Sequence, residues 1–181
     1  MSKRDGRTFT PTFDVTPQSR MGAYKSFDAL PARHRPDALR PLVEAHERRD
    51  GRSTLDAYRE TESYTTASAR RREQYDRALG SWVAFCDARD VHPTLATPAD
   101  VEAWLAALLD GSAPGFERTG RAKSVGTVYL NYYTVLEQCY DWLVTHTDHP
   151  TIYNAFLFAA AAYPEGATGR VWSEKIARGQ L

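Results

Sequence analysis

The sequence lacks several features that define common protein classes. No stretch approaches the roughly 20 consecutive apolar residues of a membrane-spanning helix. The longest apolar run, 155–163, is about half that length. No apolar signal region follows the N-terminal residues, so the sequence predicts a cytoplasmic protein without a membrane partner. Segments that alternate apolar and polar residues between turns are also missing, which predicts an all-α fold.

Cysteine and the common catalytic motifs are scarce. The two cysteines, Cys86 and Cys139, fall in apolar helical patterns and not in a CxxC or Cys/His cluster. This placement is typical of reduced thiols in a core. Phosphate-binding loops, dinucleotide fingerprints and nucleophile elbows do not occur. We therefore predict a protein with no cofactor and no metal site.

A surplus of positive charge, which is the usual mark of a nucleic-acid binder, is also missing. The formal net charge is zero, with 23 basic and 23 acidic residues. The charge is nevertheless asymmetric, because residues 1–72 carry +5 and residues 73–181 carry −5. Arginine outnumbers lysine 19 to 4. Arginine suits bidentate phosphate contacts, although a GC-rich genome would produce the same excess.

Apolar and aromatic residues are plentiful enough to build a core. Hydrophobic residues make up 42% of the chain, including four Trp, ten Tyr and seven Phe. Proline, glycine and serine concentrate in residues 1–54, which predicts an irregular or mobile arm with one short helix at about 37–49. Residues 55–163 are expected to form a helical domain. The remaining 164–181 are expected to be a tail with one possible turn at 171–176.

Four segments carry apolar residues at helical spacing and predict the main helices. They span about 66–90, 97–110, 124–145 and 150–163. One or two helical turns are also expected at 54–63. The second main helix has the clearest start, with Thr97 as cap, Pro98 at the first position and Asp100 at the third.

The order of these features is distinctive. The first helix reads Ser68-Ala-Arg-Arg-Arg-Glu-Gln-Tyr75 and continues to Trp82-Val-Ala-Phe-Cys-Asp-Ala-Arg89. Thr97–Leu105 follows, then a helix from Ser124 to Tyr140-Asp-Trp-Leu143, then His149-Pro150. Over about 65–163 this order resembles the SAM-like, or core-binding, domain of tyrosine recombinases, the phage integrase family.

Two short stretches near the C-terminus are also similar to haloarchaeal integrase-related proteins. They are Tyr153-Asn154, which precedes an Ala-rich run, and Arg170-Val-Trp172. The resemblance implies a four-helix bundle that binds double-stranded DNA. It also implies a regulator or accessory factor of a mobile element, or one half of a split recombinase. The expected partners are DNA, a recombinase or a second copy of the chain.

The family cuts DNA with Arg, Lys, His-x-x-Arg, a further His or Trp, and a tyrosine nucleophile in a separate C-terminal domain. Only 17 residues follow Pro164, so we expect no catalytic residues and no enzyme activity. His46-Glu-Arg-Arg49 matches His-x-x-Arg by spacing alone and lies before the expected domain. Tyr129, Tyr133 and Tyr140 repeat at helical spacing and are predicted to be core residues.

The resemblance implies DNA contacts at the starts of the first and third helices. The first group is Arg70, Arg71 and Arg72, whose charges oppose the helix dipole and so favour a phosphate partner. The alternative is a solvated basic stretch that pairs with Glu73 and Asp76.

The second group lies around the start of the third helix, where free N–H groups and hydroxyls suit phosphate. It consists of Arg118, Arg121, Lys123, Ser124, Thr127 and Asn131. Asn131 and Tyr132 lie off the apolar stripe, and Asn131 is a candidate for reading adenine.

A helical protein–protein interaction or dimerisation module is the alternative function, with the acidic half and exposed aromatic residues docking a partner. The two hypotheses differ in one structural expectation. A DNA-binding domain should bring the two basic groups to one face, and an interaction module need not.

Overall fold

The computed structural model describes residues 16–114 and 121–179, and within these ranges every regular element is a helix or a helical turn. The all-α prediction is confirmed. The N-terminal elements are η1 (Pro17–Arg20), η2 (Ala32–His34), α1 (Pro36–Asp50), α2 (Thr54–Tyr58), α3 (Glu62–Thr65) and α4 (Ala69–Asp87). They are followed by α5 (Pro98–Asp110), α6 (Val125–Val128), η3 (Tyr129–Tyr133), α7 (Thr134–His146), α8 (Ala155–Ala162) and α9 (Ala167–Ala177).

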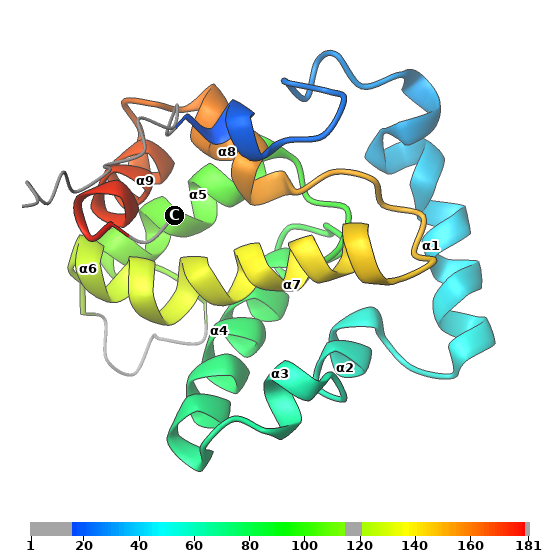
Figure 1. Cartoon of the computed structure of the whole chain (residues 1–181), viewed down its shortest axis with the longest axis horizontal. Coiled ribbons are helices and arrows are strands. Elements are labelled where there is room, and N and C mark those ends of the chain that lie inside the picture. The colour runs from blue at the N-terminus through cyan, green and yellow to red at the C-terminus, as the bar shows by residue number, and fades with distance from the viewer. Residues whose placement is uncertain (1–15, 115–120, 180–181) are drawn as a thin grey trace, which may run out of the picture.

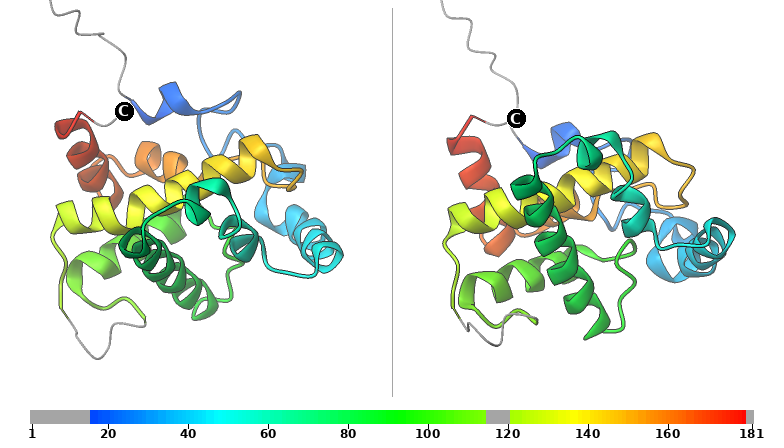
Figure 2. Two further views of the ribbon diagram at one scale, coloured as in Figure 1. Left: turned by 60° about the horizontal axis from the view of Figure 1, so that its bottom comes forward. Right: turned by 90° about the horizontal axis from the view of Figure 1, so that it is seen from below.

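One long helix, made of α6, η3 and α7, crosses the whole molecule (Figure 1). It packs against α4 on one side and against α8 and α9 on the other, while α5 packs against α8 and α9 (Figure 2). The segment η3 is π-helical. A π-helical turn inserts one extra residue and changes which side chains share a face. The predicted helix at 124–145 is thus present, with an interruption that the apolar spacing did not indicate.

Aromatic rings form the centre of the core. Phe156 is fully buried and lies 5.3–6.0 Å from the rings of Trp82, Trp104, Tyr133 and Tyr140. The hydroxyl of Tyr140 donates to the carbonyl of Pro93 at 2.7 Å. Burial raises the pKa of Tyr133 and that of Tyr140 well above the ordinary value. These tyrosines are structural, as their helical spacing predicted.

The N-terminal part of the chain packs against the domain more closely than an arm would. Residues 16–35 contain only short turns, but Met21 and Leu30 are buried in the core. The short helix expected at 37–49 is α1, whose Leu39 and Val43, four residues apart, are buried.

The C-terminal helices differ from expectation in two places. Helix α8 begins at Ala155 and not at Pro150, because Asn154 caps it by accepting from the N–H of Phe156 at 3.0 Å. The expected single turn at 171–176 is an eleven-residue helix, α9. Val171 and Trp172 are buried there and attach α9 to the core.

The start of α5 has the capping box that its sequence predicted. The side chain of Thr97 accepts from the N–H of Asp100, and Asp100 Oδ2 accepts from the N–H of Thr97 at 2.9 Å. We expect Thr97→Ala to lower the free energy of unfolding by about 1 kcal/mol, measured by urea denaturation. Thr97→Ser keeps the hydroxyl and should cost clearly less. Equal losses in the two variants would contradict this role for the cap.

Candidate nucleic-acid interface

The first predicted basic group opens α4. Arg70, Arg71 and Arg72 follow the cap Ser68, and the first turn contains no acidic residue. Among the described residues, no carboxylate lies within ion-pair distance of these three side chains. Asp76 instead pairs with Arg59 at 3.0 Å. The expected alternative, in which Asp76 neutralises these arginines, is therefore not observed.

The three arginines point in different directions. Arg71 folds back, with its Nη1 donating to Gln74 Oε1 at 2.7 Å and its guanidinium 4.8 Å from the ring centre of Tyr75. Arg72 lies toward α3, where its charge reaches Tyr64, whose raised pKa is due chiefly to burial. Arg70 is exposed and shares a helical face with Gln74 and Arg77, four and seven residues further on.

Gln74 joins α4 to η3. Its amide Nε2 donates to the carbonyl oxygen of Leu130 at 2.6 Å and to Asn131 Oδ1 at 2.8 Å. Both acceptors belong to the π-helical segment. Such segments often accompany functional sites, since they release backbone carbonyls from the regular helical bonds. The contact brings Asn131, from the second predicted group, beside the first.

Lys123 reaches the same region from the other direction. Its backbone N–H donates to Leu108 O at 3.2 Å, and its Nζ lies 5.7 Å from the ring centre of Tyr132. Burial and then the charge of Arg77 lower the pKa of Lys123. The charges of Arg77 and Lys123 thus repel each other, and an anion bound near both would relieve that repulsion.

These contacts define one surface, the basic face, made of Arg70, Gln74, Arg77, Lys123 and Asn131. Arg77 was missed by the sequence analysis, which considered only the first turn of the helix. Its spacing of seven residues from Arg70 is the signal that could have identified it. The two predicted groups thus meet in part, through Gln74, which contacts Arg71 of the first group and Asn131 of the second.

The other predicted residues have varied positions. Arg121 is exposed two residues before Lys123, and Arg118 lies outside the described residues. Ser124 caps α6 by accepting from the N–H of Thr127 at 3.2 Å, and their hydroxyls lie 2.9 Å apart. Tyr132 is only 3% exposed. The prediction that Tyr132 lies off the buried stripe is wrong, because the π-helical turn places it inside the core.

The residues set aside as chance matches have structural contacts. His46 Nε2 lies 3.3 Å from Asp50 Oδ2 and Arg49 Nη2 lies 3.0 Å from Asp148 Oδ2, so both end residues of the His-x-x-Arg match contact carboxylates. Cys86 and Cys139 are buried as free thiols, and burial raises the pKa of each.

Within residues 16–114 and 121–179, no cluster of His, Cys, Asp and Glu has an arrangement that could hold a metal ion. In the same ranges, no helix is both long and apolar enough to span a membrane.

A comparison of the chain with family models, curated proteins and solved structures finds no match. The resemblance to the integrase core-binding domain therefore stays a prediction from the residues of this sequence. The functional argument depends on the geometry of the basic face.

Proposed function

We propose that this chain binds double-stranded DNA through the basic face without cutting it. It would act as a regulator or accessory factor of a mobile element, alone, as an oligomer or beside a recombinase. The observation that carries the proposal is the contact of Gln74 with Asn131, 57 positions away in sequence, which brings the arginine-bearing face of α4 beside the second predicted group.

Two arginines of this face, Arg70 and Arg77, differ in their pairing from arginines elsewhere in the described residues. Arg20, Arg59 and Arg178 each form an ion pair with an acidic residue. Among the described residues, Arg70 and Arg77 form none. Arginine side chains at the start of a helix, beside its free N–H groups, make an electropositive surface suited to phosphate.

The test is fluorescence-anisotropy binding to a 20-base-pair mixed-sequence duplex at two salt concentrations. Each phosphate contact contributes about 0.9 to the slope of log K against log salt. We therefore expect Arg70→Ala/Arg77→Ala to weaken binding about tenfold at low salt and to reduce that slope by about 1.8.

The matched control is Arg33→Ala/Arg48→Ala, which removes the same charge from two exposed arginines near the other end of the molecule. It should leave both affinity and slope close to those of the wild type. Equal losses in the two variants would indicate a general charge effect and not a binding face. If the folded wild-type protein binds no duplex even at low salt, the interaction module becomes the better hypothesis.

A further inference from the structure

We propose that Gln74 is a positioning residue that holds Asn131 as a hydrogen-bond donor toward the ligand. This inference rests on the proposed function, and it specifies how the basic face recognises DNA. The face would contact phosphate oxygens and other acceptors, and it would not read adenine. Binding at this face would then be independent of sequence.

The geometry begins with the two ends of the Gln74 amide. Its Oε1 accepts from Arg71, and its Nε2 donates both to Leu130 O and to Asn131 Oδ1. Because the donor and the acceptor of Gln74 are both engaged, its orientation is determined by its partners. The acceptor oxygen of Asn131 is then turned toward Gln74.

The other end of the Asn131 amide is available. Among the described residues, the one buried side-chain atom without a hydrogen-bond partner is His149 Nε2. Asn131 Nδ2 donates to no described residue, so it is not enclosed and faces solvent. Asn131 is partly exposed and contacts Gln74, which lies on the same helical face as Arg70 and Arg77. Its free N–H₂ therefore adds a donor to a surface whose charged groups are also donors.

This arrangement decides what Asn131 recognises. Reading adenine requires both ends of the amide, with the oxygen accepting from N6 and the nitrogen donating to N7. The oxygen already accepts from Gln74 and is turned toward it, so the end of the amide that is presented to the ligand is the donor. A phosphate oxygen needs nothing more than a donor, and contacts of that kind carry no sequence information.

The experiment measures Kd by fluorescence anisotropy for two duplexes of equal length, one of alternating A·T pairs and one of alternating G·C pairs. Alternating sequences are used because runs of adenine narrow the minor groove and attract arginine by shape alone. The wild type is expected to bind the two duplexes with Kd values within about threefold of each other, and Asn131→Ala to weaken both equally.

Gln74→Ala is the decisive variant, because it releases the oxygen of Asn131. We expect it to acquire a preference of about fivefold or more for the A·T duplex, and Gln74→Ala/Asn131→Ala to lose that preference again. A purely structural role of Gln74 would weaken both duplexes equally and produce no preference. Thermal melting of each variant, read by circular dichroism, confirms that the folds are intact.

Besides an equal weakening by Gln74→Ala, two results would overturn the inference while leaving DNA binding in place. One is a wild-type preference for the A·T duplex that Asn131→Ala abolishes, since Asn131 would then read adenine. The other is a Gln74→Ala variant with unchanged Kd values for both duplexes. Failure of the wild type to bind either duplex would instead reject the proposed function itself.

Discussion

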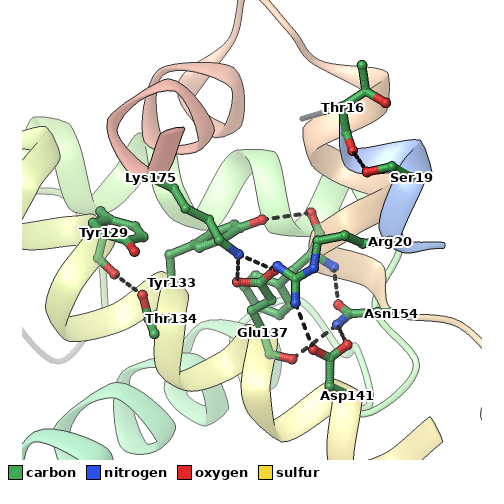
Figure 3. A network of polar contacts seen from close by, with 11 residues as sticks. Thr16, Ser19, Arg20, Tyr129, Tyr133, Thr134, Glu137, Asp141, Asn154 and Lys175 are labelled. Atoms are coloured by element: carbon green, nitrogen blue, oxygen red, sulfur yellow. Dashed lines mark hydrogen bonds and ion pairs between the residues drawn. The ribbon is translucent and has the colours of Figure 1, made fainter. Parts of the chain in front are cut away.

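Replacing Glu137 with alanine is expected to lower the free energy of unfolding by about 3–5 kcal/mol. Glu137 lies on α7 and is only 3% exposed. Both of its carboxylate oxygens accept from Lys175 Nζ on α9 at 2.7 Å, and Oε1 also accepts from Arg20 Nη1 at 2.6 Å (Figure 3). Lys175 is itself 6% exposed. Removal of the carboxylate would leave this ammonium buried without its partner, and that is the source of the large loss.

The neighbouring residues extend this network to a fourth element. Asn154, just before α8, donates its Nδ2 to Glu137 O at 3.1 Å and to Asp141 Oδ1 at 2.7 Å. Asp141 also pairs with Arg20 at 3.4 Å. The network thus holds η1, α7, α8 and α9 together, and its loss should be measurable as a lower urea midpoint.

The matched variant is Glu137→Leu/Lys175→Met, which removes the buried anion and its buried cation together. Arg20 is partly exposed and keeps Asp141 as a partner. We expect this double variant to be more stable than Glu137→Ala, because apolar side chains can replace a buried pair at little cost. A Glu137→Ala loss below about 1 kcal/mol, or a less stable double variant, would contradict the argument.

The dependence on pH gives an independent check. Burial lowers the pKa of Lys175, and Glu137 opposes that shift. Without Glu137, the folded-state pKa should fall further below the ordinary value of 10.5. The unfolded chain then binds more protons than the folded one, so the Glu137→Ala variant should recover stability as the pH rises toward that value.

Acidification from pH 6.5 to pH 4 is expected to lower the free energy of unfolding by about 3 kcal/mol through His149 alone. Burial, and then the charge of His46, lower the pKa of His149 from 6.5 to about 4. The folded state therefore holds this imidazole neutral in a range where the unfolded chain protonates it. The contribution is complete above pH 6.5 and is lost as the pH falls through 4.

The surroundings of His149 explain the shift. Its Nδ1 accepts from the N–H of Thr151 at 3.2 Å, while its Nε2 is buried without a partner. The ring of His46 lies 5.2 Å away, and the charges of Glu47, His92 and Asp148 also reach it. Because Nδ1 accepts a hydrogen bond, the neutral ring carries its hydrogen on Nε2, and protonation would place the second hydrogen on Nδ1 against the N–H of Thr151. A proton on His149 would thus break that hydrogen bond and add a buried charge beside two other imidazoles.

Glu47 extends the acid sensitivity to lower pH. Burial raises its pKa, but hydrogen bonds from His92 and Thr54 outweigh this and lower the value to about 2. The stability that depends on Glu47 is therefore lost below pH 4.5, in a separate window from that of His149. Glu47 lies on α1 and His149 contacts His46 of the same helix, so this helix should open first.

The measurement is urea denaturation of the wild type and of His149→Phe at several pH values between 7 and 4. Phenylalanine matches the ring shape and does not titrate, so the variant should show a much flatter profile, whatever its absolute stability. Hydrogen exchange of residues 36–50 would locate the opening. Parallel profiles for the two proteins would contradict the assignment to His149.

The elements that could be predicted from the sequence depend on neighbours within one or two turns. The cap at Thr97 and the buried spacing from Tyr129 to Tyr140 are of this kind, and the structure has both. The length of α9 was underestimated. Its stability comes from burying Val171 and Trp172 against other helices and not from a local sequence signal.

The candidate site likewise has a part that the sequence indicated and a part that depends on how the helices pack. The sequence indicated Arg70, Lys123 and Asn131 as single residues with suitable chemistry. It could not indicate that Gln74 contacts Asn131, 57 positions away, or that a π-helical turn withdraws Tyr132 into the core. Such contacts depend on how α4 crosses the long helix, and residue spacing within either segment contains no information about that crossing.

The sequence by itself determined the helical class, most of the helices and the residue types available for binding, because hydrophobic periodicity and capping act over a few residues. The tertiary structure alone decided which charges are neutralised. Arg20 and Glu137 pair across 117 positions and Lys175 and Glu137 across 38, while Arg70 and Arg77 remain exposed. The physical reason is that ion pairing and desolvation depend on distance in space, which only the packing of the helices determines.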